Sequence, residues 1–181
     1  MTRYAVLLRG VNVGGNNKVP MARLRELAAD LGYREITTYV QSGNLVVTAE
    51  AKQAAALEKS VADIIREELG VDIAVMVRSR KELATALDAN PFAEIADDPA
   101  RMVISFLASQ PAADKRNALD RNEFAPELFE FGDRCLYLWY PAGMGRSKMS
   151  AAPWDRRLGV RGTGRNVRTI AKLVEMLDGA E

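Results

Sequence analysis

The apolar positions in the first 78 residues predict four strands and two helices. Strands are predicted for four short apolar stretches, namely residues 3–8, 36–40, 45–48 and 72–78. Helices are predicted where apolar residues recur every three or four positions and a glycine follows, over residues 20–31 and 51–69. The order strand-helix-strand-strand-helix-strand is that of the ferredoxin-like, or split βαβ, unit. The sequence therefore predicts a four-stranded antiparallel sheet with two helices on one face.

The remaining residues predict a second α+β region. A helix over residues 79–90 opens on a capping box, because Glu82 follows Ser79 by three residues. The other predicted elements are strands over 101–107, 127–131 and 134–140 and helices over 112–122, 148–158 and 164–178. This order indicates a modified copy of the first unit, although no sequence repeat supports a duplication. We thus expect an α+β fold with a ferredoxin-like βαββαβ subdomain over residues 1–78. A smaller α+β subdomain over residues 79–181 follows and ends in a helix.

Composition excludes several kinds of chemistry. The chain has 181 residues, of which 48% are hydrophobic and 27% charged, as in an ordinary globular protein. It has no histidine and one cysteine, Cys135, which excludes a Ser-His-Asp triad, a Cys-His pair, imidazole metal ligands and an internal disulfide. Glu94, Asp97 and Asp98 do not have the spacing of a metal-binding loop, so no metal site is expected. No apolar stretch is long enough for a membrane helix or a signal peptide, and we expect a cytoplasmic protein without membrane association.

The charges are distributed unevenly along the chain. In total there are 25 basic and 24 acidic residues. Residues 134–172 contain nine basic residues and one acidic residue, Asp155, and the first 25 residues contain five basic residues and no acidic one. This asymmetry indicates an anionic partner. The alternative is a basic surface that is only solvated, or that pairs with the acidic middle of the chain.

Three polar segments are candidate ligand-binding loops. Residues 9–18 are rich in Gly and Asn and connect a strand to a helix, where backbone N–H groups can contact a phosphate, although the phosphate-loop pattern is not matched. The second segment is Gln-Ser-Gly-Asn at residues 41–44, and the third is Gly-Arg-Ser-Lys-Met-Ser at residues 145–150. In the third segment, Ser147 is placed to cap the helix that follows. Ordinary turn formation by Gly, Asn and Ser is the alternative interpretation of these segments.

The fourth candidate is a predicted helix N-terminus with an unfavourable charge. With Thr163 as the expected N-cap, Arg165 and Arg168 occupy the first turn and share a face with Lys172. Each cation at the positive end of a helix costs about 0.3–1 kcal/mol unless an anion lies near it. The pattern therefore predicts either a bound anion or ion pairs with carboxylates of the acidic middle.

Several phrases of the sequence resemble a family of bacterial proteins. They are LLRGVNVGGNNKVPMARLREL, TYVQSGNLVV, VRSRKEL, NPF, GMGRSKM and RNVRTIAKL, in order over most of the chain. These phrases are similar to those of the domain-of-unknown-function family numbered 1697. The resemblance implies an α+β fold of two subdomains, the first ferredoxin-like, and it implies no activity, cofactor or partner. The chain departs from the family at Val167, where an aromatic residue is usual, and at Met149, where leucine is usual.

The family phrases include the polar segments, which predicts one shared ligand-binding site. Its residues are Arg9, Asn12, Lys18, Gln41, Asn44, Arg146, Ser147, Lys148, Arg165, Asn166 and Arg168. The best-supported hypothesis is a protein that binds an anionic ligand, either nucleic acid or a nucleotide, through these basic segments. Stacking of single-stranded RNA on the sheet is disfavoured, because the predicted strand 45–48 has no aromatic residue. Trp154, beside Arg156 and Arg157, is a better stacking candidate than Trp139 or Tyr140, which are expected to pack inside.

Two alternative functions stay open. One is an enzyme that acts on a phosphorylated small molecule, with the basic residues as a phosphate clamp. Tyr39 and Lys148 are catalytic candidates only by elimination, and the sequence identifies no catalytic residue. The other is a protein-interaction module without a small ligand. The residues identify neither a cofactor nor a protein partner.

Overall fold

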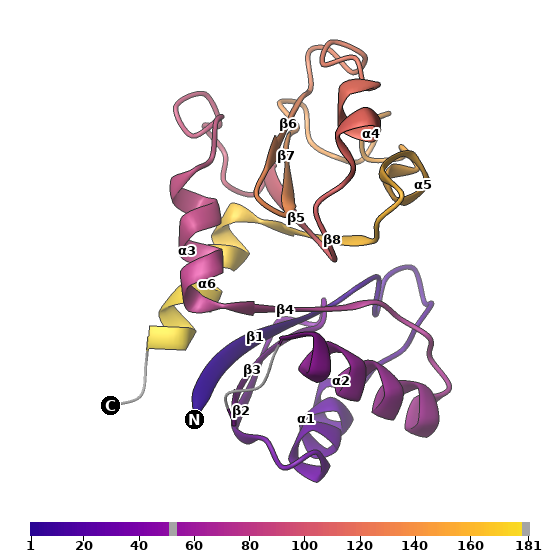
Figure 1. The fold of residues 1–181 in the computed structure, drawn as a ribbon, viewed down its shortest axis with the longest axis vertical. Coiled ribbons are helices and arrows are strands. Elements are labelled where there is room, and N and C mark those ends of the chain that lie inside the picture. Colours follow the sequence, from indigo (N-terminus) through magenta and orange to yellow (C-terminus); the bar gives the residue numbers. More distant parts are fainter. Residues whose placement is uncertain (51–53, 179–181) are drawn as a thin grey trace. The chain divides into compact units, whose positions relative to one another are not determined.

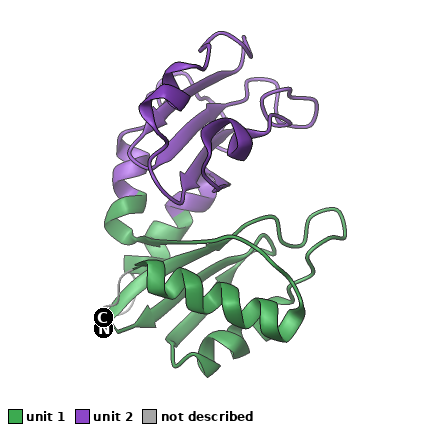
Figure 2. Ribbon diagram, turned by 45° about the vertical axis from the view of Figure 1, so that its right-hand side comes forward, with its two compact units in different colours: residues 1–83, 172–181 green, residues 84–171 purple. Residues whose placement is uncertain are grey.

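The computed structural model describes residues 1–50 and 54–178, which form two four-stranded antiparallel sheets with helices packed on them (Figure 1). The chain divides into two compact units (Figure 2). Unit 1 comprises residues 1–83 together with the C-terminal residues from Lys172, and unit 2 comprises Ala84–Ala171. The α+β class with two subdomains that the sequence predicts is confirmed. A subdomain boundary after residue 78 stays a prediction.

Unit 1 contains the elements predicted for the N-terminal region, in the predicted order. They are β1 (Thr2–Leu8), α1 (Met21–Asp30), β2 (Arg34–Tyr39), β3 (Asn44–Ala49), α2 (Ala54–Leu69) and β4 (Val75–Ser79). The strands lie in the order β2-β3-β1-β4, and all neighbours are antiparallel. Each helix therefore connects two parallel strands that have a third strand between them.

Both faces of the unit 1 sheet are buried along β1, β3 and β4, whereas every residue of β2 is exposed or half-buried. On one face, Val6, Leu45 and Val77 pack against the apolar residues of α1 and α2, which cover this face (Figure 1). On the other face, Leu7 and Val46 are fully buried as well. Since neither face is solvated along these three strands, they need apolar residues at nearly every position. That requirement is why short continuous apolar stretches predicted β1 and β3.

Unit 2 is built from the second half of the chain. The elements are α3 (Arg80–Asp88), β5 (Met102–Leu107), α4 (Ala113–Asn117), β6 (Leu128–Gly132), β7 (Cys135–Trp139), α5 (Trp154–Leu158), β8 (Gly162–Asn166) and α6 (Val167–Asp178). Helix α3 begins in unit 1 and ends in unit 2, whereas α6 begins in unit 2 and ends in unit 1. One face of the sheet carries a core that includes Phe129, Leu136 and Met149. On the other face, the Tyr137 hydroxyl donates a hydrogen bond of 2.8 Å to the carbonyl of Ala86 in α3.

The two sheets repeat one topology. The second sheet has the order β6-β7-β5-β8, which is the order of the first sheet when the strands of each are counted along the chain. Backbone hydrogen bonds repeat as well. The Leu8 N–H donates to the Gly43 carbonyl at 2.8 Å, and the Leu107 N–H donates to the Arg134 carbonyl at 2.9 Å. Both acceptor residues, Gly43 and Arg134, have a positive φ. The copy indicated by the element order is therefore complete, with β8 as its fourth strand.

Strand β8 corrects the sequence analysis. Residues 162–166 were predicted as a cap and the start of a helix, but they pair with β5 as a strand, and the helix begins at Val167. The sequence Gly-Thr-Gly-Arg-Asn contains residues that are rare in strands, which hid this element. The predicted helices over 112–122 and 148–158 are also too long, because only Ala113–Asn117 and Trp154–Leu158 are helical.

Candidate functional site

The structure divides the eleven predicted site residues between the two units. Unit 1 contains Arg9, Asn12, Lys18, Gln41 and Asn44, and unit 2 contains Arg146, Ser147, Lys148, Arg165, Asn166 and Arg168. The unit 1 residues follow β1 and β2 or begin β3, so they lie at one edge of that sheet. The single site shared by all eleven residues stays a prediction.

Asn12 holds two loops of unit 1 together. Its amide nitrogen donates to the carbonyls of Val19, at 2.9 Å, and Gln41, at 2.8 Å, and its amide oxygen accepts from the Val19 N–H at 2.9 Å. The backbone of Asn12 has a φ of 56°, which asparagine tolerates better than most residues. Between these contacts the loop forms a tight hairpin, in which the Asn16 N–H donates to the Val13 carbonyl. Asn12 is therefore a structural residue of this edge.

Replacing Asn12 by glycine is expected to lower the free energy of unfolding by about 2 kcal/mol more than replacing Asn16 by glycine. Both changes add backbone freedom, but only the first removes three hydrogen bonds, each worth about 0.5–1.5 kcal/mol. Glycine keeps the positive φ accessible at residue 12. Urea unfolding of both variants measures the difference, and equal losses would contradict this role for Asn12.

The other unit 1 candidates divide into buried and exposed side chains. Asn44 is fully buried, and its amide nitrogen donates to the Tyr39 carbonyl at 2.9 Å and to the Ser42 hydroxyl at 3.1 Å. The turn interpretation of residues 41–44 thus accounts for Asn44. Lys18 and Gln41 are exposed, and Arg9 is half-buried. Only these last three side chains reach the surface of the unit 1 edge.

Arg165 and Asn166 are placed differently from the sequence prediction. Arg165 lies in β8, not in the first turn of α6, and it is buried. Its guanidinium donates to the Thr163 hydroxyl and to the Gly164 carbonyl, both at 2.8 Å. Burial lowers the pKa of Arg165 to about 10, so its side chain keeps its charge at neutral pH. Thr163 is therefore not the N-cap, and the face proposed for Arg165 with Arg168 and Lys172 does not exist.

Asn166 is the residue that caps α6. Its side-chain oxygen accepts a hydrogen bond of 2.8 Å from the Thr169 N–H. The equivalent junction in unit 1 is the predicted capping box, which is confirmed. There the Glu82 N–H donates to the Ser79 hydroxyl at 3.2 Å, and the Ser79 N–H donates to the Glu82 carboxylate at 2.8 Å. The first turn of α3 thus contains an acidic residue, whereas that of α6 contains none and carries exposed Arg168.

The loop between β7 and α5 presents two more cations. Met149 anchors it, because this side chain is fully buried and its carbonyl accepts a hydrogen bond of 2.9 Å from the Trp154 indole. Arg146 and Lys148 precede this anchor and are exposed. Ser147 does not cap α5 as predicted; its hydroxyl accepts from the Ser150 N–H at 2.8 Å within the loop. Since Met149 is a core residue, the departure from leucine at this position is a change between two apolar side chains.

Topology places the start of this loop, Arg101 and Arg168 at one edge of the unit 2 sheet. The loop that carries Arg146 and Lys148 leaves the end of β7, and Arg168 follows the end of β8. Between them lies β5, which is antiparallel to both, so its first residues lie at the same edge. Arg101 directly precedes β5, and its guanidinium donates to the Pro141 carbonyl at 2.8 Å and contacts the Asp98 carboxylate at 3.3 Å. We call Arg101, Arg146, Lys148 and Arg168 the basic edge.

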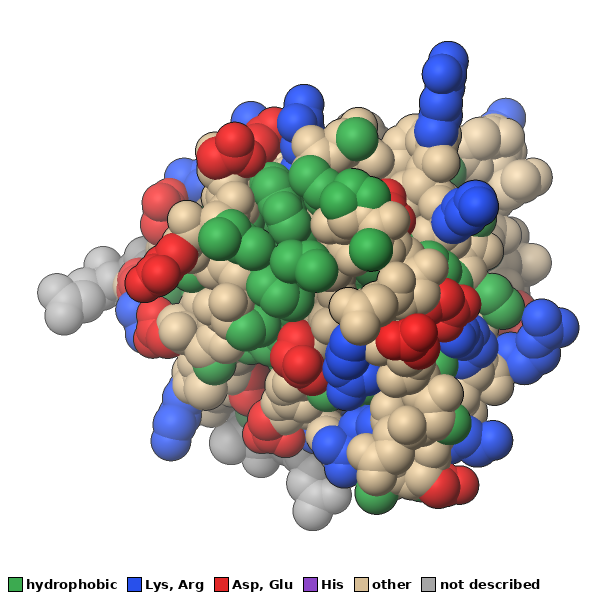
Figure 3. Space-filling view, turned by 90° about the horizontal axis from the view of Figure 1, so that it is seen from above, with side chains coloured by type: hydrophobic (Ala, Val, Ile, Leu, Met, Phe, Trp, Pro, Cys, Tyr) green, Lys and Arg blue, Asp and Glu red, His purple; other side chains and the backbone are tan. Residues whose placement is uncertain are grey.

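Sequence reasoning missed Arg101, because it was taken as the first residue of a strand. The other basic residues of 134–172 lie elsewhere in the structure. Arg134 and Arg161 lie at the opposite edge of the sheet, and Lys172 pairs with Glu175 at 2.8 Å. Figure 3 likewise shows charged side chains of both signs around a hydrophobic area on the face drawn there. The nine basic residues of 134–172 therefore do not form one continuous surface.

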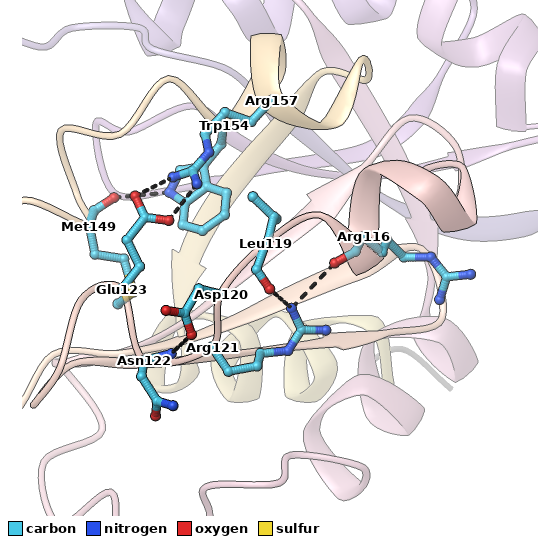
Figure 4. Close-up of polar contacts among 9 residues, drawn as sticks. All are labelled: Arg116, Leu119, Asp120, Arg121, Asn122, Glu123, Met149, Trp154 and Arg157. Carbon is cyan, nitrogen blue, oxygen red and sulfur yellow. Dashed lines mark hydrogen bonds and ion pairs between the residues drawn. The ribbon is translucent and has the colours of Figure 1, made fainter.

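The aromatic residues of unit 2 pack against each other. Trp154 lies 5.2 Å from Phe129 and 5.8 Å from Phe124, measured between ring centroids. The Arg157 guanidinium lies over the Trp154 ring and donates to the Glu123 carboxylate at 3.1 Å (Figure 4). Trp139 and Tyr140 are buried, as predicted. Trp154 is half-buried and its ring contacts are intramolecular, which argues against it as a stacking platform.

Within residues 1–50 and 54–178, no three Cys, Asp or Glu side chains are grouped so that they could hold a metal ion. Of the helices in this part of the chain, none has both the length and the apolar character needed to cross a membrane.

Comparison with known proteins agrees with this fold. A family model described as "Protein of unknown function (DUF1697)" matches residues 1–137. The conserved bacterial protein SP0830 from Streptococcus pneumoniae has a similar structure, with a TM-score of 0.74 and 26% sequence identity, and the match covers 97% of this chain and 98% of that one. No curated protein matches the sequence. Because the family model spans well over half of its residues, the chain belongs to the family of proteins of unknown function DUF1697.

Proposed function

We propose that the chain is an anion-binding protein whose ligand contacts the basic edge of unit 2. The observation that carries the proposal is that Arg101 and Arg168 lie at neighbouring strand ends at one edge of the unit 2 sheet, and that the loop carrying Arg146 and Lys148 leaves the same edge. All four side chains are exposed, so a ligand can reach them. Arg101 is the one with a carboxylate contact, to Asp98, and an exposed pair of this kind contributes only about 0–1 kcal/mol, so an anion can compete for it.

The repeat within the chain supports the same conclusion. At the junction of β4 and α3, the Glu82 carboxylate lies at the helix start and satisfies the Ser79 N–H. At the equivalent junction of β8 and α6, Thr169 stands in place of glutamate, and Arg168 stands where unit 1 has Lys81. The first turn of α3 thus contains a carboxylate beside its cations, whereas the first turn of α6 contains a cation and no carboxylate. The missing carboxylate favours an anion near the start of α6.

The proposal includes two more specific expectations from the sequence, a ferredoxin-like fold of residues 1–78 and a cytoplasmic location. The strand order β2-β3-β1-β4 supports the ferredoxin-like interpretation of residues 1–78. The second expectation is a cytoplasmic location, which stays part of the proposal; Cys135, the single cysteine, is buried. An enzyme on a phosphorylated substrate is the less favoured alternative, because within the described residues no carboxylate contacts Tyr39 or Lys148; the charged neighbour of Tyr39 is Lys172.

Removal of three charges from the basic edge tests the proposal. The variant R146Q/K148Q/R168Q is expected to bind its anionic probe about 10- to 100-fold more weakly, because each exposed contact contributes about 0.5–1 kcal/mol. The probes are pyrophosphate, ATP and a DNA oligonucleotide, each measured by isothermal titration calorimetry with the wild-type chain first.

Arg161→Gln is the matched control for net charge. Arg161 is exposed in the same unit but at the opposite edge of the sheet. If Arg161→Gln lost affinity in proportion to its one charge, only net charge would matter. If the wild-type chain bound none of the three probes, the proposal would be refuted.

A further inference from the structure

The ligand class follows from how the basic edge is exposed, provided that the proposed anion site is real. We infer that the basic edge binds double-stranded nucleic acid through its phosphates, without stacking on the bases. Three properties of the described residues carry this inference: the exposure of the cations, their spread across three strands, and the absence of exposed aromatic rings.

The exposure of the cations disfavours a small ligand. Arg146, Lys148 and Arg168 are exposed, and the Arg101 side chain retains 46% of its accessible surface. Exposed ion pairs are individually weak, so even four of them would hold a single small phosphate with only about millimolar affinity. A polyanion gains more, because each neutralised phosphate also releases condensed counterions. The site therefore suits a ligand with many regularly spaced phosphates.

The spread of the cations matches such a ligand. Arg101 and Arg168 lie beside the ends of the adjacent strands β5 and β8, and the loop that carries Arg146 and Lys148 begins at the end of β7, on the other side of β5. Neighbouring strands are about 4.8 Å apart, so the ends of β7 and β8 are separated by about 10 Å. Over that length a DNA duplex carries about six phosphate charges. Several cations can therefore contact different phosphates at the same time.

The burial of the aromatic residues favours a duplex over a single strand as the ligand. Proteins that bind single strands stack the bases on aromatic side chains. Every Phe, Tyr and Trp of this chain lies within the described residues, and none has an exposed side chain. Trp154 and Phe124, the half-buried rings of α5 and the loop before β6, pack against each other and against Arg157. The bases of a duplex are already stacked inside it and need no such platform.

Fluorescence anisotropy of the full chain tests this inference. The probes are a labelled 20-base-pair DNA duplex, a second duplex of unrelated sequence, and the single strand of the first duplex, across a range of salt. We expect the duplexes to bind with equal affinity and at least about tenfold more tightly than the single strand. With up to four phosphate contacts, log K is expected to fall against log salt with a slope of about −3 to −4. The slope of R146Q/K148Q/R168Q is expected to be smaller by about 2 to 3, and that of Arg161→Gln unchanged.

The outcomes distinguish the inference from the proposed function. Tighter binding of the single strand, or displacement of all probes by pyrophosphate at micromolar concentration, would overturn the duplex assignment and leave an anion site at the basic edge. Binding that R146Q/K148Q/R168Q and Arg161→Gln weaken in proportion to their charge would overturn the site itself. No binding of any probe at low salt, including pyrophosphate, would overturn both.

Discussion

Replacing Gly43 by alanine is expected to lower the free energy of unfolding by about 3 kcal/mol or more, the largest effect of any single methyl group in unit 1. A Cβ on Gly43 would lie 2.5 Å from the Val11 Cγ2 and 2.7 Å from the Leu8 Cβ, both in the buried part of the sheet edge. Neither neighbour can move freely, because Leu8 and Val11 are core residues. The backbone of β1 would have to shift away from the turn before β3, which would strain the Leu8–Gly43 hydrogen bond.

Two other positions with a positive φ distinguish the steric cost of a Cβ at Gly43 from the cost of its backbone conformation. Arg134 occupies the equivalent turn of unit 2 with a φ of 50°, so this backbone conformation can carry a side chain. Gly14 is the matched control, since its φ is 57° and a Cβ there would meet nothing within 4 Å. Gly14→Ala is expected to cost only about 1 kcal/mol, from the φ value alone. Urea unfolding of the two variants measures the difference, and equal costs would show that the close approach of Gly43 to Val11 is unimportant.

The stability of the protein is expected to fall steeply above pH 10, because two buried tyrosines resist ionisation. Burial raises the pKa of Tyr137, and the nearby Cys135 thiol adds to this effect. Burial likewise raises the pKa of Tyr140, with a further contribution from Glu127. The unfolded chain loses these protons near pH 10, so it binds fewer protons than the folded chain at higher pH. Stability is therefore fully present below pH 10 and is lost as the pH rises, by up to about 1.4 kcal/mol per pH unit for each tyrosine.

Arg165 changes the stability in the opposite direction as the pH rises. Its pKa is lowered to about 10 in the folded chain from 12.5, so the unfolded chain holds this proton longer and stability gains between these pH values. For these three groups together the slope is expected to be about −1.4 kcal/mol per pH unit above pH 10, and Tyr33, whose pKa burial also raises, makes it steeper. Urea unfolding at pH 8.5, 10, 10.5 and 11 measures it.

The double variant Y137F/Y140F tests whether the two tyrosines cause this loss of stability. Its absolute stability is expected to be lower, since the hydrogen bond from Tyr137 to the Ala86 carbonyl is lost, but its slope above pH 10 should vanish or reverse. Absorbance titration of tyrosinate on the folded protein provides an independent reading. If the double variant kept the wild-type slope, other groups would have to be responsible.

The sequence alone determined the order and type of nearly all elements, for a simple physical reason. Burial on both faces of a sheet, or on one face of a helix, leaves a local periodicity that can be read without a structure. Apolar stretches predicted β1, β3 and β5, and the spacing of Leu57, Val61 and Ile65 predicted the buried face of α2. The capping box at Ser79 was equally local. Three of the four polar segments were recognised as loops.

Only the tertiary structure decided what those polar residues do. Asn12, Asn44 and Asn166 look alike in the sequence, but Asn12 binds a carbonyl of a distant loop, Asn44 holds the turn before β3, and Asn166 caps α6. Strand β8 exists because β5 offers an edge to pair with, and its glycines allow that approach: a Cβ on Gly162 would lie 2.7 Å from Leu107. Pairing partners of this kind are distant in the chain, so no local pattern encodes them. The same holds for the basic edge, where antiparallel pairing, rather than spacing along the chain, places Arg101 between the loop of Arg146 and the helix of Arg168.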